Sequence, residues 1–522
     1  MAGVWETFAA MFEKRSAWIA AGIAFVAALL TMTADPVGVF HDDAIYLLTA
    51  KALAEGHGLV YTFLPGNPPA IHYPPLWPAI LAAVWKIAPP FPENIAWFKL
   101  INPVFVAVAA AGTVVVGRRL FGLPWWLAFG VAVVSTAAVP VLVLTNVLLS
   151  EPLFLALLLP TILAHERFAR ERSVRWAIIA AALAALIVLG RTIAGVVVVA
   201  TVMVLLLDRR WRDVAVYSLV VGVLLLPWQM LVWDAAPGFP DELRGSYGPY
   251  LEWVMDGYRE GGWPFLHDVF MKNIESGWIM SGIFVSPLIR GVAREALTGG
   301  TLALFLAGLV ILWSRRGLRI TALAVAGYVG VVLSWPFQVE RFIWALWPLL
   351  VLIVAGASYD LVRGLRAEGR PRAAVAMLVL AVALATGNVI YNVRGLSRGW
   401  TSSASRDMSD RSLILVRYVN ADERLHGKVI ATEVAPMVAL YTGQTVVPVE
   451  ILTTREHIEP KTPAENVETI QRIDRAFAPD AYVLIPQGAH LRALLAATLD
   501  STRRLQDVTP VGVPVRAFFT HP

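Results

Sequence analysis

About eleven apolar segments run through this 522-residue chain, and they constrain its fold more than any other feature. Most approach the roughly 20 residues that a helix needs to cross a bilayer. Hydrophobic residues make up 57% of the chain, charged residues only 16%, and the mean hydropathy is +0.64. We therefore predict a polytopic α-helical membrane protein. The segments cover about 17–34, 97–117, 124–145, 150–166, 174–190, 192–207, 213–233, 296–313, 319–335, 341–360 and 372–391.

Basic residues fall in alternate connections between these segments. They are Lys14/Arg15, Arg118/Arg119, Arg167/Arg170/Arg172/Arg175, Arg209/Arg210/Arg212, Arg315/Arg316/Arg319 and Arg363/Arg366/Arg370/Arg372. Because cytoplasmic loops are rich in Lys and Arg, this pattern predicts a cytoplasmic N-terminus. The first apolar segment is long and Ala34-Asp35-Pro36 is a poor cleavage site, so we expect a retained anchor. Loops 35–96 and 234–295, and the tail from Tyr391, are then extracytoplasmic. The net charge of +5 lies in these short loops, so it does not indicate a nucleic-acid partner.

The chain divides by composition into a membrane part, 1–395, and a tail, 396–522, that we expect to form a small extracytoplasmic α/β domain. In the tail we predict helices over Ser412–Val419 and Ala464–Phe477, and strands over Lys428–Thr432, Ala481–Ile485 and Val511–Phe519. It holds no P-loop, dinucleotide motif or metal-ligand spacing. With no cysteine in the chain, disulfides and thiolate chemistry are excluded.

Two adjacent carboxylates, Asp42 and Asp43, follow the first apolar segment and open a predicted helix over Ala44–Glu55. One interpretation is a helix start, with Asp42 as a cap. The other is that the pair holds a proton, a cation or a polar substrate at the membrane surface. Further along the same loop, His72 and Tyr73 precede a short amphipathic helix beginning at Leu76, whose Trp77 and Trp85 suit the membrane interface.

Three short connections place further charges on the same predicted face. Glu151 begins the fourth apolar segment, with Ser150 as a candidate cap. Arg191, against the topological trend, requires either an anionic partner or contact with lipid headgroups. Glu340 and Arg341 lie in a third turn, where a local ion pair is the simpler interpretation. The aromatic loop 234–295 either shapes an acceptor groove or forms a cap without substrate contact.

Acidic and basic groups at one membrane rim suit transfer from a lipid-anchored phosphate. Cations hold the phosphate, and a carboxylate takes a proton from an acceptor hydroxyl. A divalent metal ion held by the carboxylates is compatible with the sequence but not required by it. The residues gathered on this face are Asp42, Asp43, His72, Tyr73, Glu151, Arg191, Glu340 and Arg341.

The order of motifs resembles that of the GT-C glycosyltransferases, over roughly residues 15–360. The motifs are Asp42-Asp43-Ala44, Tyr73-Pro74-Pro75-Leu76, Gly117-Arg118-Arg119-Leu120-Phe121-Gly122, Ser150-Glu151-Pro152-Leu153 and Arg341-Phe342. The most similar branch contains protein O-mannosyltransferases and bacterial lipid A aminoarabinose transferases. The resemblance implies a polyprenyl-phosphate sugar donor, an extracytoplasmic cavity and inverting transfer to a glycan, lipid or protein acceptor.

The resemblance also implies roles for individual residues. The family's first-loop pair is usually Asp-Glu, and its first acid, the catalytic base, corresponds to Asp42; Asp43 is shorter than the usual Glu. The second acid corresponds to Glu151, which would orient the base or bind a metal. Arg341 and Arg191, with Glu340 beside Arg341, would form the donor-phosphate site, and His72 and Tyr73 stand near the family's basic position before Pro-Pro.

We therefore hypothesise a polyprenyl-phosphate-sugar-dependent glycosyltransferase in the plasma membrane, the inner membrane of a bacterium. A transporter or flippase of lipid-linked sugars is the alternative from another class, and it would predict repeated or broken spans with charges near the bilayer midplane. An O-antigen polymerase or ligase would instead place its main arginines in a large later loop. The sequence shows no internal repeat.

Overall fold

The computed structural model describes residues 2–486, 488–497, 504–510 and 513–521. Within them, eight helices are long and apolar enough to cross a membrane, and a bent helix pair makes a ninth candidate span. Two shorter apolar helices complete the eleven predicted segments. The helices are α1 (Ala2–Thr31), α5 (Ile101–Arg119), α6 (Trp125–Thr136), α7 (Val139–Asn146), α8 (Glu151–Glu171), α9 (Val174–Gly190), α10 (Gly195–Leu207), α11 (Trp211–Ala235), α14 (Val292–Ser314), α15 (Arg319–Ser334), α17 (Trp347–Ala367) and α18 (Pro371–Ser397).

The third predicted span is broken between α6 and α7, which are bent by 47°. Ala138 is extended, so the backbone N–H of Val139 lies outside the regular helical ladder. A buried N–H inside a membrane needs a partner, and the side-chain oxygen of Asn392 on α18 accepts it at 2.8 Å. The backbone N–H left free at the break is therefore hydrogen-bonded by a neighbouring helix.

Shorter elements lie between the spans at one end of the bundle. The first loop forms α2 (Asp42–Ala54), α3 (Leu76–Ile87) and α4 (Ile95–Lys99). The second forms the 3-10 helices η2 (Ala236–Gly238) and η3 (Asp241–Leu243), then α12 (Arg244–Tyr247) and α13 (Tyr250–Val285), which bends at Gly262 where φ is +61°. The 3-10 helix η1 (Thr192–Ala194) follows α9 at this end, whereas η4 (Arg316–Leu318) lies at the opposite end, beside Arg170 near the end of α8. A separate short helix, α16 (Glu340–Trp344), stands where the sequence predicted the start of a span.

The tail contains a five-stranded sheet of order β2-β1-β3-β5-β4. Strands β2, β1 and β3 are parallel, and β5 is antiparallel to both β3 and β4. The elements are α19 (Trp400–Ala421), η5 (Glu423–Leu425), β1 (Val429–Thr432), α20 (Ala435–Thr442), β2 (Thr445–Pro448), η6 (Thr454–His457), α21 (Pro463–Phe477), β3 (Ala481–Leu484), α22 (Ala489–Ala497), β4 (Arg504–Asp507) and β5 (Arg516–His521).

The predicted α/β character of the tail is confirmed, although β2, β4, α20 and α22 were not predicted. The final strand begins at Arg516, later than expected, and residues 511–512 of that prediction lie outside the described residues. The division of the chain at residue 395 stays a prediction.

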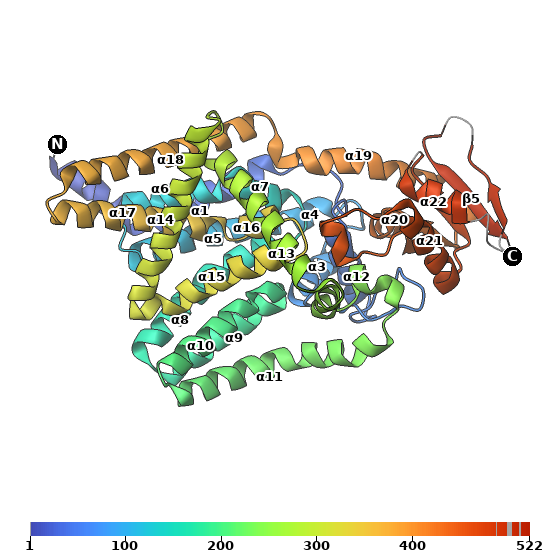
Figure 1. Cartoon of the computed structure of the whole chain (residues 1–522), viewed down its shortest axis with the longest axis horizontal. Helices are drawn as coiled ribbons and strands as arrows, with labels where there is room; N and C mark the ends of the chain where they lie inside the picture. The colour runs from blue at the N-terminus through green and yellow to red at the C-terminus, as the bar shows by residue number, and fades with distance from the viewer. Residues whose placement is uncertain (1, 487, 498–503, 511–512, 522) are drawn as a thin grey trace.

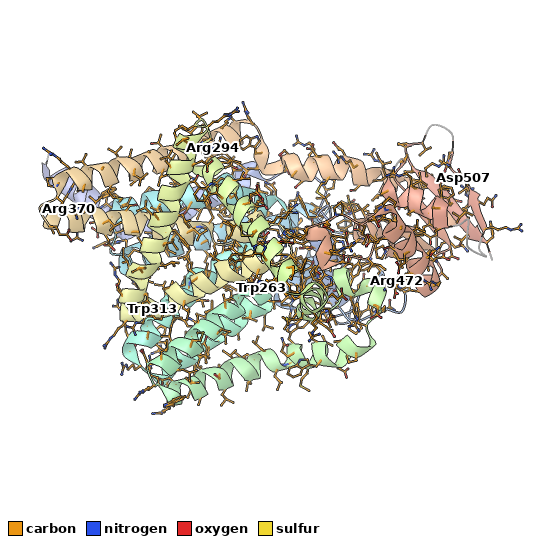
Figure 2. All side chains as sticks on the ribbon, in the orientation of Figure 1. Trp263, Arg294, Trp313, Arg370, Arg472 and Asp507 are labelled. Atoms are coloured by element: carbon orange, nitrogen blue, oxygen red, sulfur yellow. The ribbon has the colours of Figure 1, made fainter. Side chains whose placement is uncertain are left out.

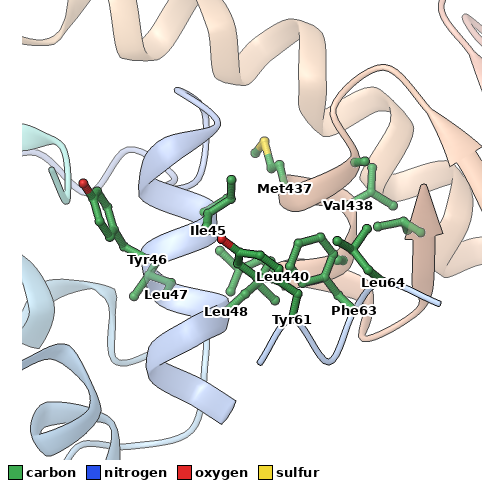
Figure 3. Packing of buried hydrophobic residues seen from close by; sticks show 14 of the residues in the cluster. Ile45, Tyr46, Leu47, Leu48, Tyr61, Phe63, Leu64, Met437, Val438 and Leu440 are labelled. Atoms are coloured by element: carbon green, nitrogen blue, oxygen red, sulfur yellow. The ribbon is translucent and has the colours of Figure 1, made fainter. Parts of the chain in front are cut away.

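The two large loops and the tail share one hydrophobic core. Ile45 and Leu48 of α2 face Met437 and Leu440 of α20, while Tyr46 points to the other side of α2 (Figure 3). The backbone N–H of Val446 donates to a first-loop carbonyl, that of Phe63, at 2.9 Å. Segments that the topology placed on one side of the membrane therefore pack together.

The molecule is elongated, and its two ends differ. The N-terminus lies at one end of the helix bundle and the sheet at the other (Figure 1). Arg370, from one of the basic turns, lies at the N-terminal end, whereas Asp507 lies at the sheet (Figure 2). Helices that cross a membrane in alternation place successive loops at opposite ends of the bundle, as seen here for the basic turn and the sheet. Which end faces the cytoplasm stays a prediction.

Trp77 packs inside the protein rather than against lipid, and its depth at the membrane interface stays a prediction. Its side chain is fully buried, and its Nε1–H donates to the carbonyl oxygen of Leu148 at 3.0 Å. An amphipathic helix has a buried face as well as an exposed one, and Trp77 lies on the buried face of α3.

Close packing of α18 gives a stability prediction. A Cβ added at Gly387 would fall on the carbonyl oxygen of Val285, whereas one added at Gly222 of α11 would meet nothing within 4 Å. We expect Gly387→Ala to lower the free energy of unfolding by about 1–3 kcal/mol. Gly222→Ala, also within a long helix, should be neutral or slightly stabilising. Thermal unfolding of the purified variants tests this, and equal midpoints would contradict the packing.

Candidate active site

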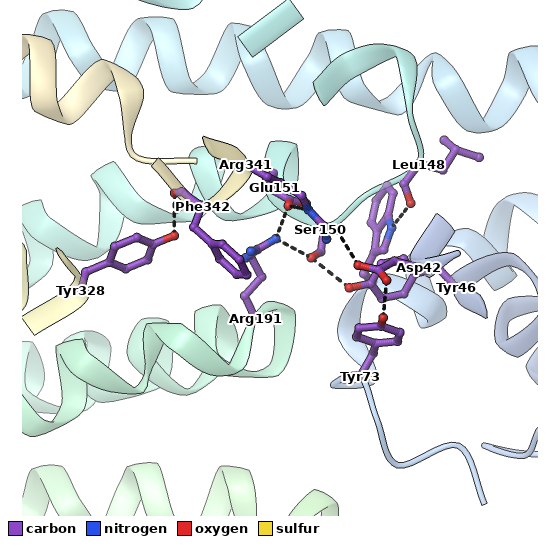
Figure 4. Close-up of polar contacts among 11 residues, drawn as sticks. Asp42, Tyr46, Tyr73, Leu148, Ser150, Glu151, Arg191, Tyr328, Arg341 and Phe342 are labelled. Atoms are coloured by element: carbon purple, nitrogen blue, oxygen red, sulfur yellow. Dashed lines mark hydrogen bonds and ion pairs between the residues drawn. The ribbon is translucent and has the colours of Figure 1, made fainter. Parts of the chain in front are cut away.

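Asp42 is the first residue of α2, and both of its carboxylate oxygens accept hydrogen bonds. Oδ1 accepts from the Tyr73 hydroxyl at 2.6 Å, and Oδ2 accepts from Nη1 of Arg341 at 2.6 Å (Figure 4). Its side chain is 15% exposed. Asp42 does not cap the helix, because the N-cap position is His41. The helix-start interpretation therefore does not account for this carboxylate.

Arg341 links Asp42 to a second carboxylate. Its Nε–H donates to Oε1 of Glu151, whose side chain is completely buried at the start of α8. Glu151 also pairs with Nη1 of Arg191 at 2.7 Å. The result is a continuous chain of alternating charge, Asp42–Arg341–Glu151–Arg191, which we call the charge relay of the site (Figure 4).

The charge relay decides two of the open alternatives. Arg191 is only 7% exposed and is paired with an acid, so contact with lipid headgroups is wrong and the anionic partner is confirmed. The local pair between Glu340 and Arg341 is also wrong, because Arg341 reaches acids 190 and 299 residues away. Among the described residues, Glu340 has no ion-pair partner and lies outside the charge relay.

Ser150 does not cap α8 as predicted. Its side chain makes no capping bond, and its Oγ instead accepts from Nη1 of Arg191 at 3.3 Å. The same oxygen lies 3.2 Å from the hydroxyl of Tyr46. Tyr46 was not predicted, yet it lies four residues after Asp42, so the two share a helix face. The four-residue spacing between Asp42 and Tyr46 was therefore the sequence signal that could have identified Tyr46.

Asp43 makes no bond to any member of the charge relay. Its carboxylate is fully buried and accepts backbone N–H bonds from Gly38 at 2.7 Å and Phe40 at 2.9 Å. Burial raises the pKa of Asp43 and outweighs these bonds, which act in the opposite direction. This carboxylate fixes the loop that leads into α2, so its geometry indicates a positioning role.

His72 lies in a second layer behind Tyr73. Its Nδ1–H donates to the carbonyl of Gly248 at 2.6 Å, and its ring packs on Tyr250 with centroids 3.9 Å apart. The ring centroid of Tyr73 is 4.5 Å away. Burial lowers the pKa of His72 to about 4, although the bond to Gly248 favours the protonated form. His72 is therefore neutral near pH 7.

Asp42 is ionised near pH 7. Burial acts to raise the pKa of this carboxyl, but the charges of Arg341 and His41 and the hydrogen bonds from Tyr73 and Arg341 outweigh it and hold the pKa below its ordinary value. An ionised carboxylate held by two donors and still partly exposed is suited to accept a proton.

A divalent metal ion finds no ready ligand set here. The described residues contain no group of three or more His, Asp or Glu side chains placed to bind one. Asp42 and Glu151 are already neutralised by guanidinium groups.

The structure thus brings together five of the eight predicted residues: Asp42, Tyr73, Glu151, Arg191 and Arg341. Asp43 and His72 support the loops around them, and Glu340 stands apart.

No protein-family model matches the chain, and no curated protein matches it. Several solved structures, in contrast, match the chain. ArnT from Cupriavidus metallidurans bound to undecaprenyl phosphate superposes with a TM-score of 0.56 at 13% identity, covering 99% of this chain and 98% of that one. Its apo form gives 0.52 at 12% identity, covering 96% and 97%. The apo oligosaccharyltransferase of Archaeoglobus fulgidus gives 0.52 at 14%, covering 91% of this chain and 69% of that one.

These likenesses show the fold alone, a fold that this chain shares with ArnT and with an archaeal oligosaccharyltransferase. The predicted architecture, a many-helix membrane protein with a small C-terminal sheet, is confirmed.

The buried imidazole of His72 gives a pH prediction. The unfolded side chain titrates near 6.5 and the folded one near 4, so the unfolded state binds more protons between these values. Stability contributed by the neutral imidazole is complete above about pH 6.5 and is lost as the pH falls toward 4. At pH 5 the loss is roughly 2 kcal/mol.

His72→Asn, which keeps an N–H donor, should therefore lose less thermal stability than the wild type between pH 7.5 and pH 5. The matched control is His57→Asn, because the side chain of His57 is 57% exposed. If all three proteins lose stability equally, the environment described for His72 is wrong.

Proposed function

We propose that this chain is a membrane glycosyltransferase that moves a sugar from a polyprenyl-phosphate donor to an acceptor on the extracytoplasmic face. The observation that supports this most is the charge relay: the partly exposed carboxylate of Asp42 pairs directly with Arg341, and the buried Glu151 joins Arg341 to Arg191. We propose both the chemical class of the donor and the side of the membrane on which transfer takes place.

Asp42 is proposed as the general base. Its carboxylate takes the proton of an acceptor hydroxyl as the oxygen attacks the anomeric carbon. The bond from that carbon to the phosphate oxygen breaks, its electron pair leaves with the phosphate, and the configuration inverts. Tyr73 and Arg341 hold the two carboxylate oxygens, so the base is oriented before the acceptor binds.

Arg341 and Arg191 are proposed to hold the donor phosphate. The charge relay has two acids and two bases, and is neutral when both acids are ionised. Once Asp42 accepts a proton, the two guanidinium groups face only Glu151. The positive charge then left over stabilises the negative charge that develops on the leaving phosphate.

A small apolar crevice of about 20 Å³, too small to hold a prenyl chain as it stands, lies beside the proposed phosphate site. It lies among α8, α10, α15 and α17, and Tyr328 belongs to its wall. The Tyr328 hydroxyl donates to the carbonyl of Phe342 at 2.9 Å, and the guanidinium of Arg191 lies over the Phe342 ring at 5.5 Å. An apolar surface therefore adjoins the cations. The ArnT structure, which holds undecaprenyl phosphate, has the same fold.

Transport of a lipid-linked sugar without chemistry is the alternative. The charge relay argues against it, because its acids and bases gather where loops meet the bundle and tie a loop helix, α2, to the starts of α8 and α16. A charge chain that fixes elements together suits a preorganised reaction centre rather than alternating access.

Asp42→Asn removes the proposed base while keeping the shape of the side chain. We expect transfer to fall by at least about 100-fold, because general base catalysis contributes roughly that much, while expression and thermal stability change little. The measurement is the release of lipid phosphate from labelled polyprenyl-phosphate sugars by purified protein. Glu55→Gln, a surface carboxylate of the same loop, is the control.

Retained transfer in Asp42→Asn would remove this residue from the mechanism. Movement of labelled lipid across a bilayer, with no lipid phosphate released by the wild type, would instead establish transport.

Tyr73→Phe deletes one donor to Asp42. That hydrogen bond favours the ionised carboxylate, so its loss raises the pKa of Asp42. We expect the acid limb of the pH–rate profile to move to higher pH, with the rate well above the limb reduced less. A uniform loss of rate at every pH would show that Tyr73 has a purely structural role.

A further inference from the structure

The Gly117–Gly122 motif has no part in the proposed chemistry, yet its two arginines line a distinct groove. Arg118 and Arg119 at the end of α5 meet Lys14 and Ser16 of α1 and Trp125 of α6 around a space of about 680 Å³. That volume lies within the roughly 300–1,000 Å³ typical of small-molecule sites.

The groove lies far from the charge relay. The other end of α5 packs near the start of α8, where Asn102 donates to the carbonyls of Thr145 and Val147. At 1.5 Å per residue, the 19 residues of α5 separate its two ends by on the order of 25 Å. The groove is thus a separate site at the opposite end of the bundle.

The groove carries an excess of positive charge. It is lined by three cations, Lys14, Arg118 and Arg119, and one acid, Glu13, which pairs with Arg118 at 2.5 Å. Within the described part of the chain, Lys14 and Arg119 are exposed and have no ion-pair partner. Arginines at a helix C-terminus also stabilise the helix dipole, but that role does not require a cavity.

Apolar side chains continue from the groove along the surface. Trp18 of α1 is 77% exposed and lies four residues after Lys14, so both are on one face of the helix. Trp126, beside Trp125 at the start of α6, is 58% exposed. Exposed tryptophans beside cations are typical of a membrane interface, with polar headgroups above and acyl chains below.

We propose that this groove binds the phosphodiester headgroup of an anionic membrane phospholipid. Lys14 and Arg119 contact the phosphate, Arg118 is held in place by Glu13, and the acyl chains lie against the exposed face around Trp18. Basic pockets between spanning helices on the predicted cytoplasmic side suit such lipids. This inference is independent of the reaction proposed for Asp42.

Lipid binding by the purified full-length chain tests the site. Native mass spectrometry, with added phosphatidylglycerol or phosphatidylcholine as probes, gives the bound fraction against lipid concentration. In the double variant Lys14→Gln/Arg119→Gln, we expect the apparent affinity for phosphatidylglycerol to fall at least fivefold. Lys14→Arg/Arg119→Lys should retain it, which shows that the helices still pack.

The matched control is Arg366→Gln/Arg372→Gln, two cations of another basic turn that do not line the groove. This control should leave the affinity for phosphatidylglycerol unchanged. Equal losses in the two double variants, or no loss in either, would overturn the proposal, as would equal affinity of the wild type for both lipids. Displacement of the lipid by millimolar inorganic phosphate would assign the groove to a soluble anion instead.

Discussion

A fully buried carboxylate must be paired, and the site depends on how the fold pairs Glu151. Its side chain has no exposed surface, and two guanidinium groups reach the same oxygen, Oε1. Removing one partner from a buried ion pair typically costs 3–5 kcal/mol, because the other charge stays buried. The four members of the charge relay come from four separate segments. A chain that folded with any of these segments misplaced would therefore leave a buried charge without a partner.

The same constraint shapes the chemistry. The four alternating charges hold one another in place before any substrate binds. Electrostatic stabilisation of a transition state is strongest when the charged groups do not need to reorganise. Asp42 and Arg341 are 15% and 26% exposed, against 7% for Arg191 and 0% for Glu151, so the charge relay is open at one end. Glu151 and Arg191 hold Arg341 from the buried side. Protonation of Asp42, at the open end, leaves the four side chains with a net positive charge.

Predictions from hydropathy and from the alternation of loops across the membrane were correct, whereas predictions from neighbouring residues, such as helix capping and local ion pairs, were wrong. Hydropathy located the spans, and the alternation of arginines placed Asp42, Glu151, Arg191 and Arg341 on one face before any contact was known. Local rules made Ser150 a helix cap and Glu340 the ion-pair partner of Arg341. Both predictions were wrong, because a partner distant in sequence replaced the local one. Strand β2 was not predicted although it is as long as β1 and β3, because it ends at Pro448 and a proline within a short run weakens a strand assignment.

The loop that carries Asp42 connects the site to the rest of the molecule. Asp43 holds the backbone at Gly38 and Phe40, and the hydroxyl of Tyr441 on α20 accepts the N–H of Val37 at 3.1 Å. A Cβ at Gly38 would stand 3.1 Å from Leu440, so α20 packs directly against this turn. The tail contributes no member of the charge relay, yet it presses on the segment that sets the position of the proposed base. The position of α20 is thus linked to Asp42 through the Val37–Gly38 turn and Asp43 rather than through the membrane helices.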